Sequence, residues 1–161
     1  MSSCSLQIVG NRVRATATTD ACIERYTGVT WPADQWSQVV IRAMPGAVGG
    51  GPGPAVRCAA SGNTCYFAET SAAGGKLWRT NNGAYTQLAT FAAANVGDTL
   101  RLEVFANELR VKVNGETRLI YTETSSSALL SGSAGIKVKA STLTPTTDAE
   151  LDDWAGGSVS P

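Results

Sequence analysis

The sequence predicts an all-β fold, with two antiparallel sheets of about a dozen strands in total packed face to face and negligible helix. The first observation is the segment Gly97–Gly115, where apolar residues occupy every second position of 100–104 and of 109–113. This period of two indicates strands with one dry and one wet face. The second is Asn114-Gly115, which supplies the positive φ values of a tight reversal. The third is the absence from this segment of the three- and four-residue apolar spacing of a helix. A second sheet is the simplest cover for the dry face.

Turn signals at intervals of roughly 8–12 residues divide the rest of the chain into further strands, as in β-sandwiches. Gly10-Asn11 and Asn81–Gly83 are expected turns. Trp31–Asp34 is expected to be a connection, because proline cannot donate to a ladder. The expected strands are Leu6–Val9, Arg12–Thr18, Asp20–Tyr26, Trp36–Ala43, Ala55–Ala60, Thr64–Thr70, Lys76–Thr80, Tyr85–Phe91, those of the meander over 97–121, Gly135–Ala140 and Glu150–Trp154.

The remaining segments are expected to be loops, of which the Gly- and Pro-rich stretch Pro45–Pro54 is the longest and most flexible. Residues 156–161 are expected to form a tail. The length of 161 residues predicts a single domain, residues 1–161, with its core over about 6–157. Within the strand Gly135–Ala140, alternation predicts that Ile136 and Val138 face the core and that Lys137 and Lys139 face solvent.

The charge balance and the missing histidine exclude several classes of function. Lys+Arg and Asp+Glu number 13 each and the formal net charge is +0, so we expect no nucleic-acid partner and no basic membrane-binding surface. The count of 0 His removes the commonest general base and zinc ligand. No apolar run approaches the ~20 residues that span a bilayer. Residues Met1–Cys4 lack the basic and apolar regions of a signal peptide, so none is expected.

Cys4, Cys22, Cys58 and Cys65 allow three pairings. Cys58 and Cys65 flank Ser61-Gly62, and a two-residue turn there would place them opposite each other on adjacent strands. We expect the disulfides Cys58–Cys65 and Cys4–Cys22, the alternative being four small buried thiols. Disulfides imply work outside a reducing cytosol, so an extracellular or virion-surface location is expected. Without a signal peptide, this suggests an excised domain or release by cell lysis.

Seven segments occur in an order that resembles the concanavalin A-like, laminin G-like jelly-roll superfamily: GNRVRATA, WSQVVIRA, AVRCAASGNTCYFAE, KLWRTNNGAYTQLAT, GDTLRLEVFANELRVKVNG, GSAGIKV and LDDWAGG. The resemblance covers about Leu6 to Gly157, and the meander followed by Ala-Gly-Ile and Asp-Asp-Trp is its most specific part. It implies a two-sheet antiparallel jelly-roll sandwich. It implies no single function, because the superfamily includes lectins, glycanases, adhesion modules and virion parts.

One departure from the superfamily pattern concerns the start of the chain. Domains of this kind usually begin with a further strand, carrying an acidic-aromatic motif, before the segment that matches Leu6. Its apparent absence would leave a sheet edge bare, and bare edges promote aggregation. We therefore expect this edge to be used in assembly, with other chains of a particle or with a second copy.

The resemblance also allows a test for catalysis. Laminarinase-type glucanases of this fold carry Glu-x-Asp-x-(x)-Glu on one strand, which places a nucleophile and an acid on the same face. Glu150 and Asp152 share a face here, but Trp154 and Ala155 replace the third acid. Glu116 and Glu123 are isolated. No catalytic residue and no enzymatic activity are expected.

Binding residues are a better match to the composition. Aromatic rings stack on the apolar faces of sugars, and the candidate glycan-binding residues are Trp78, Tyr85, Tyr66, Arg57, Arg79 and Asn82, with Trp31, Trp36 and Asn81 as further candidates. Ordinary sheet packing is the alternative for each ring, and Trp78, opposite the Leu77 face, is the best candidate for exposure. No cofactor is expected. Asp152 and Asp153 are candidate calcium ligands on a weak signal, because no Asp-x-Asp-x-Asp-Gly loop occurs.

Three classes of function follow. The expected one is a non-enzymatic structural or interaction module displayed on a larger assembly, best matched by a bacteriophage capsid decoration or tail protein with other chains as partners. The alternative is a carbohydrate-binding, lectin-like or adhesion module with a surface glycan as ligand. A glycoside hydrolase is a remote third.

Overall fold

The computed structural model describes residues 5–16, 21–46, 50–60, 63–139 and 149–160 as thirteen strands and no helix. No helix of this part of the chain could therefore span a membrane. The strands are β1 Leu6–Val9, β2 Arg12–Ala15, β3 Cys22–Arg25, β4 Gln35–Ala43, β5 Gly51–Cys58, β6 Cys65–Ser71, β7 Gly74–Asn81, β8 Ala84–Phe91, β9 Thr99–Phe105, β10 Glu108–Val113, β11 Glu116–Thr122, β12 Ser133–Lys139 and β13 Glu150–Ser158.

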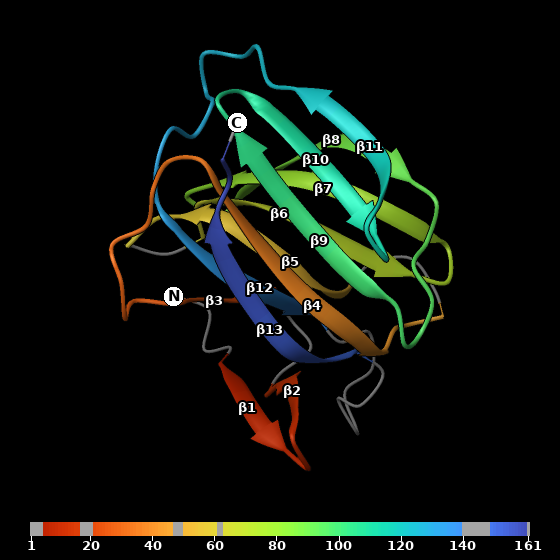
Figure 1. The fold of residues 1–161 in the computed structure, drawn as a ribbon. Helices are drawn as coiled ribbons and strands as arrows, with labels where there is room; N and C mark the ends of the chain where they lie inside the picture. The colour runs from red at the N-terminus through yellow and green to blue at the C-terminus, as the bar shows by residue number, and fades with distance from the viewer. Residues whose placement is uncertain (1–4, 17–20, 47–49, 61–62, 140–148, 161) are drawn as a thin grey trace.

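The strands form two antiparallel sheets, as the sequence predicted. The seven-stranded sheet has the order β1-β2-β13-β4-β9-β10-β11, and the six-stranded sheet has the order β3-β12-β5-β6-β7-β8. Figure 1 shows the seven-stranded sheet in front of the six-stranded one, with the β1–β2 hairpin projecting below the sandwich. The non-consecutive neighbours in both sheets give the crossing connections of a jelly roll.

The meander of β9, β10 and β11 has the pairing predicted from its period-two pattern. Asn114 and Gly115 have φ values of 52° and 84°, as the reversal between β10 and β11 requires. The dry face of the meander joins side chains of the facing sheet in one core. Its fully or nearly fully buried members include Val39, Ile41, Val56, Tyr66, Ala68, Leu77, Leu100, Leu102, Val104, Leu109, Val111, Val113, Val138 and Leu151.

The expected loop Pro45–Pro54 is wrong over its second part, because Gly51–Pro54 begins the buried strand β5. Gly51 to Pro54 pair residue by residue with β12, whereas only Ala55 and Val56 pair with β6. Prolines two residues apart direct their missing N–H groups toward the same neighbouring strand. A Gly-Pro-Gly-Pro segment can therefore form the ladder of hydrogen bonds with one neighbouring strand, here β12. Its composition alone did not predict a strand.

The expected tail at 156–161 is wrong for its first three residues. Gly156, Gly157 and Ser158 belong to β13 and pair with Ser37, Trp36 and Gln35 of β4. A Cβ at Gly156 would lie 2.8 Å from the Trp31 ring, and one at Gly157 would lie 2.9 Å from Nε1 of Trp36. The glycines let the indole rings pack on the strand, so this strand end is specified by tertiary packing.

The cysteines differ from the expected pairing. Cys58 and Cys65 lie on adjacent strands, but both are free thiols, so the expected Cys58–Cys65 disulfide is wrong for this structure. They are buried in a small apolar cluster with Ala55 and Phe67, where a neutral thiol packs as a small hydrophobe. The pKa of the Cys65 thiol is raised well above 9.0, chiefly by a hydrogen bond with Cys58 and, to a smaller extent, by burial. Cys22 is disulfide-bonded, and its expected partner Cys4 lies outside the described residues.

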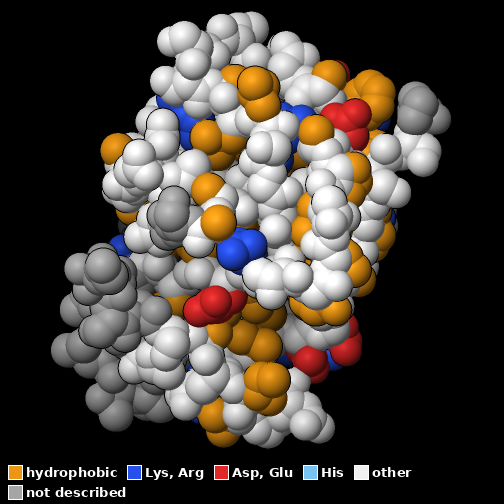
Figure 2. Space-filling view, turned by 90° about the vertical axis from the view of Figure 1, so that its left-hand side faces the viewer, with side chains coloured by type: hydrophobic (Ala, Val, Ile, Leu, Met, Phe, Trp, Pro, Cys, Tyr) orange, Lys and Arg blue, Asp and Glu red, His pale blue; other side chains and the backbone are white. Residues whose placement is uncertain are grey.

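The surface includes two further features. The β1–β2 hairpin ends the seven-stranded sheet, and Ile8 is 77% exposed on it; use of this edge in assembly stays a prediction. The face in Figure 2 carries hydrophobic, basic and acidic side chains interspersed among uncharged groups, so charge of one sign does not dominate it.

The close approach of β5 to β6 gives a test of the fold. A Cβ at Gly53 would lie 1.8 Å from the carbonyl oxygen of Ala68, so Gly53→Ala should lower the free energy of unfolding by roughly 1–3 kcal/mol, the usual cost of overpacking. Gly46→Ala is the matched control, because a Cβ there meets nothing within 4 Å. Urea unfolding measures both, and equal stability of the two variants would contradict this packing.

Candidate functional site

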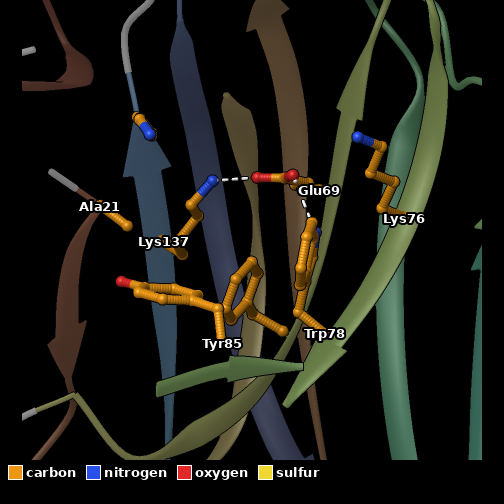
Figure 3. Close-up of a pocket in the computed structure, with 8 residues that line it drawn as sticks. Ala21, Glu69, Lys76, Trp78, Tyr85 and Lys137 are labelled. Carbon is orange, nitrogen blue, oxygen red and sulfur yellow. Dashed lines mark hydrogen bonds and ion pairs between the residues drawn. The ribbon is translucent and has the colours of Figure 1, made fainter. Parts of the chain in front are cut away.

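The outer face of the six-stranded sheet carries a hollow of ≈ 250 Å³ (Figure 3). Residues two apart on a strand share a face, so β6, β7 and β12 each present two side chains here. The hollow is lined by Ala21, Phe67, Glu69, Lys76, Trp78, Tyr85, Lys137 and Lys139. Its volume lies just below the ~300–1,000 Å³ of pockets for drug-sized ligands, so it suits a small ligand or one end of a larger one.

The base of the hollow depends on the glycines of β5, the strand between β12 and β6. Lys137 pairs with Gly53, and Lys139 pairs with Gly51. Directly paired residues point to the same face of a sheet. The glycines therefore leave a strip of β5 without side chains on the face that bears the two lysines. Only side chains from neighbouring strands can cover this strip.

Lys137 reaches over this strip. Its Nζ donates to the carbonyl oxygen of Gly51 at 3.1 Å and pairs with the carboxylate of Glu69. The Lys137 side chain is only 1% exposed, so the prediction that it faces solvent is wrong. The prediction that Lys137 and Val138 point to opposite faces of the sheet is correct. Burial lowers the pKa of Lys137 below 10.5, and the Glu69 carboxylate opposes that effect. The ion pair is what allows the ammonium group to be buried.

Glu69 also fixes the indole of Trp78, because Nε1 of Trp78 donates to Oε1 of Glu69 at 2.9 Å. Figure 3 shows the carboxylate between the ammonium group of Lys137 and this indole. Phe67 lies nearly parallel to the Trp78 ring at 6.3 Å, and Tyr85 meets the ring edge-on at 6.4 Å. Nζ of Lys76 lies 5.7 Å from the centre of the ring. Trp78 is thus a positioned, half-buried ring at the hollow, and Tyr85 is 45% exposed beside it.

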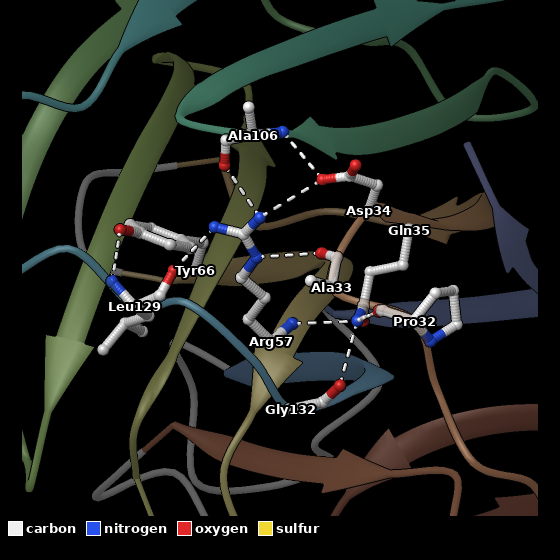
Figure 4. Close-up of polar contacts among 9 residues, drawn as sticks. All are labelled: Pro32, Ala33, Asp34, Gln35, Arg57, Tyr66, Ala106, Leu129 and Gly132. Atoms are coloured by element: carbon white, nitrogen blue, oxygen red, sulfur yellow. Dashed lines mark hydrogen bonds and ion pairs between the residues drawn. The ribbon is translucent and has the colours of Figure 1, made fainter. Parts of the chain in front are cut away.

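Arg57 and Tyr66, two other predicted glycan-binding residues, lie elsewhere and inside the molecule (Figure 4). The Arg57 guanidinium donates to the carbonyl oxygens of Ala33, Leu129 and Ala106 at 3.0, 2.6 and 2.8 Å. Arg57 has a φ of 51°, which interrupts the alternation of β5 at this point. Arg57 lies apart from the hollow, and its donors are used to join three loops; a contact of Arg57 with a glycan stays a prediction.

The loops at this end are joined by further hydrogen bonds. The Tyr66 hydroxyl accepts from the backbone N–H of Leu129 at 2.8 Å. Gln35 donates to the carbonyl oxygens of Pro32 and Gly132 at 2.6 and 2.9 Å, and its Oε1 accepts from the backbone N–H of Arg57. Burial raises the pKa of Tyr66. Tyr66 is therefore a buried structural residue and is not available to stack on a sugar.

The other predicted binding residues are also apart from the hollow. Arg79 pairs with the buried carboxylate of Glu123 at 2.8 Å. Asn81 and Asn82 are exposed near the turn between β7 and β8, with Asn82 at a φ of 49°. Trp31 packs edge-on against Tyr26 and Trp154. Trp36 lies on the outer face of the other sheet beneath the guanidinium of Arg101, 3.9 Å from the ring centre.

The acidic cluster of β13 is engaged by arginines. Arg42 pairs with Asp152 at 3.5 Å and with Asp153 at 3.0 Å, and Glu150 is buried between Arg12 and Arg14. Within the described ranges, no group of three or more His, Cys, Asp or Glu residues could hold a metal ion. The expected calcium ligands therefore have no third acidic partner there, and the single guanidinium of Arg42 pairs with both carboxylates.

Of the six main candidates, the structure places Trp78 and Tyr85 at the hollow. Four lining residues were not predicted from the sequence: Glu69, Lys76, Lys137 and Lys139. A signal for them existed, since Lys76-x-Trp78, Phe67-x-Glu69 and Lys137-x-Lys139 each place two residues on one face. The sequence did not show that β12, β5, β6 and β7 are neighbours, so it could not bring these pairs together.

Comparisons with solved structures show the concanavalin A-like jelly-roll sandwich fold. The chain is similar to the carbohydrate-binding module CBM66 from Bacillus subtilis, with a TM-score of 0.65, 13% identity and coverage of 95% of this chain and 91% of that chain. It is similar to the galectin LEC-6 from Caenorhabditis elegans, with a TM-score of 0.56, 11% identity and coverage of 94% and 99%. It is also similar to a legume lectin-like domain from Entamoeba histolytica, with a TM-score of 0.55, 15% identity and coverage of 96% and 87%.

No protein-family model matches the sequence, and no curated protein does. At these identities the similarity shows the fold alone. The expected two-sheet jelly-roll sandwich is therefore confirmed, and the expected role on a bacteriophage particle gains no support from these structures.

The Arg57 network predicts a large effect on stability. Arg57→Met removes the donors to three carbonyl oxygens, and each buried group left unsatisfied costs ~1–3 kcal/mol. We expect a clear loss of thermal stability, measured by calorimetry. Arg118→Met is the matched control, because Arg118 pairs only with the exposed Glu116. Equal melting temperatures of the two variants would show that the Arg57 network contributes little.

Glu123 predicts a dependence of stability on pH. Burial raises its pKa, but hydrogen bonds from Ser125 and the Arg79 guanidinium outweigh burial and hold the pKa below 4.5. A carboxyl group with a lowered pKa stabilises the fold above its unfolded pKa, and this contribution is lost as pH falls through the folded pKa. Glu123→Gln should therefore flatten the decline of stability below about pH 5, measured by urea unfolding. Glu116, whose side chain is 75% exposed, is the control position, and Glu116→Gln should lose stability with falling pH as the parent does. The same loss of stability in Glu123→Gln would show that Glu123 is not a source of the pH dependence.

Proposed function

We propose that this protein is a non-catalytic, lectin-like carbohydrate-binding module, and that the hollow on the outer face of the six-stranded sheet is its binding site. The observation that carries the proposal is Trp78, a half-buried ring at this hollow that Glu69 holds by a hydrogen bond of 2.9 Å. The lectin and carbohydrate-binding structures that share the fold agree with the proposal.

The chemistry of the hollow suits a sugar. Sugars present an apolar CH face and a rim of hydroxyl groups, so they are bound by an aromatic ring together with polar groups around it. Trp78 and Tyr85 supply rings, and Lys76 and Lys139 supply ammonium donors around them. Because Trp78 is held on several sides before any ligand arrives, little conformational entropy is lost on binding.

The described lining of the hollow does not show the pair of carboxyl groups that glycoside hydrolysis needs. Most glycosidases place two carboxyl groups about 5–9.5 Å apart across the scissile bond. Glu69 is the carboxylate that lines this hollow, and it is already engaged by Lys137 and by the indole of Trp78. The arrangement favours a module that binds a saccharide and does not cleave it.

An extracellular location belongs to the same proposal. A glycan ligand and the disulfide bond at Cys22 both suit a protein that works outside a reducing cytosol. A role in a virion has no observation in its favour, so we do not propose one.

A glycan array followed by titration calorimetry tests the proposed function. We expect Trp78→Ala to lose at least tenfold in affinity for any saccharide that the parent binds, because the variant has no ring on which the apolar face of the sugar can stack. Trp36→Ala is the matched control, since it removes an indole from the outer face of the other sheet. Binding that survives Trp78→Ala, or that Trp36→Ala abolishes, would place the site elsewhere, and the absence of binding to all saccharides would contradict the function.

A further inference from the structure

We propose that the saccharide is acidic, and that Lys76 and Lys139 bind its carboxylate or sulfate groups at the rim of the hollow. The inference rests on the proposed function and deepens it by naming the class of ligand. Among the described residues, three lysines and one carboxylate line the hollow, although the whole chain has a formal net charge of +0. The site is therefore more basic than the molecule that carries it.

The local excess remains after the internal ion pair is removed. Glu69 neutralises the buried ammonium group of Lys137. Lys76 and Lys139 remain, and neither has a carboxylate of the described residues within salt-bridge distance. They are partly buried rather than extended into solvent. Two partly buried lysine side chains without a described carboxylate partner, beside one small hollow, favour a ligand that carries negative charge.

This lack of partners is uncommon in the molecule. All basic residues of the chain fall in the described ranges, and apart from Arg25, Lys76 and Lys139 each has a described carboxylate within 4.0 Å. All three exceptions belong to the six-stranded sheet. Arg25 lies two residues from Ile23, which pairs with Lys137, so Arg25 is on the same face. The unmatched positive charge of the described chain is therefore gathered on one face.

The position of these charges suits an acidic sugar better than a linear polyanion. Figure 3 shows Lys137 to the left of Glu69 and Lys76 to its right, with the Trp78 ring just below the Glu69 carboxylate. Lys76 extends over the indole, with Nζ 5.7 Å from the ring centre. A ring stacked on Trp78 would bring a substituent acid group within reach of this ammonium. The Trp78 ring and the lysine charges together select an acidic sugar. A neutral sugar lacks a group for the lysines, and a linear polyanion lacks a ring to stack on Trp78.

Paired ligands test the class of saccharide. The probes are oligogalacturonate and its methyl ester, which differ in charge and by one methyl group on each esterified carboxyl, and a sulfated galactan oligosaccharide with its desulfated counterpart. Titration calorimetry at physiological salt should give at least one acidic probe roughly tenfold higher affinity than its neutral partner, the usual effect of a charge-assisted contact. The two pairs identify which acid group is bound. Polyglutamate should bind no better than the neutral sugars.

Variants assign the effect to the rim. Lys76→Gln and Lys139→Gln should each lower the affinity for the acidic probe several-fold and that for its neutral partner much less, because the glutamine amide still donates hydrogen bonds to a sugar but carries no charge. Arg118→Gln removes one charge from the exposed edge strand β11 and should change neither. Trp78→Ala should lower the affinity for both partners of a pair.

The outcomes separate the two proposals. Equal affinity for the charged and neutral partners, with loss in Trp78→Ala, would overturn the acidic ligand and keep the carbohydrate-binding function. Binding of polyglutamate as tight as that of the acidic sugar would also overturn the acidic saccharide, because charge alone would explain it. Binding of no probe, together with no binding on the glycan array, would overturn both proposals.

Discussion

The buried ion pair between Lys137 and Glu69 is the interaction on which the proposed site depends. Lys137 crosses the strip of β5 that has no side chains, and Glu69 meets it from β6 while accepting the hydrogen bond from Trp78. An ion pair of this kind adds little net stability, because desolvation offsets most of the Coulomb attraction. Loss of one partner is different, since it leaves an uncompensated charge and costs ~3–5 kcal/mol. The pair therefore specifies the arrangement of the face more than it stabilises the fold.

A second polar network holds the opposite side of the six-stranded sheet. Arg57, Gln35 and Tyr66 donate to or accept from the backbone of loops that lie outside the ladders of the two sheets. Buried backbone groups in such loops need partners, and long polar side chains supply them where no ladder is available. The two sheets are thus joined by hydrophobic packing in the middle of the sandwich. At the end of the sandwich where Leu129 lies, polar contacts join them.

Most of the fold could be predicted because the decisive pattern is local. In the meander, the alternation over Leu100–Val104 and Leu109–Val113 defines β9 and β10, and the Asn114-Gly115 turn defines where β11 begins. β5 could not be predicted in the same way. Its start reads as a flexible Gly-Pro loop, and only its neighbours explain why Gly51 and Gly53 are required there.

The site was less predictable than the fold for the same reason. Trp78 could be assigned to the outer face from its own strand, but Lys137 and Glu69 are 68 residues apart and meet only because β12, β5 and β6 are adjacent. Arg57 shows the converse error. Its charge suggested a surface role, whereas a positive φ turns it inward at the end of β5.

The glycine strip of β5 has a consequence for how the binding face can change. Positions 51 and 53 tolerate no side chain without displacing the backbone of β6, so the base of the hollow is fixed by the fold. The rim positions 76, 85 and 139 are partly open to solvent, so a changed side chain there has room that positions 51 and 53 do not offer. Selectivity could therefore diverge by exchange of rim side chains alone, so that members of a lineage with this face would share its base and differ in what they recognise.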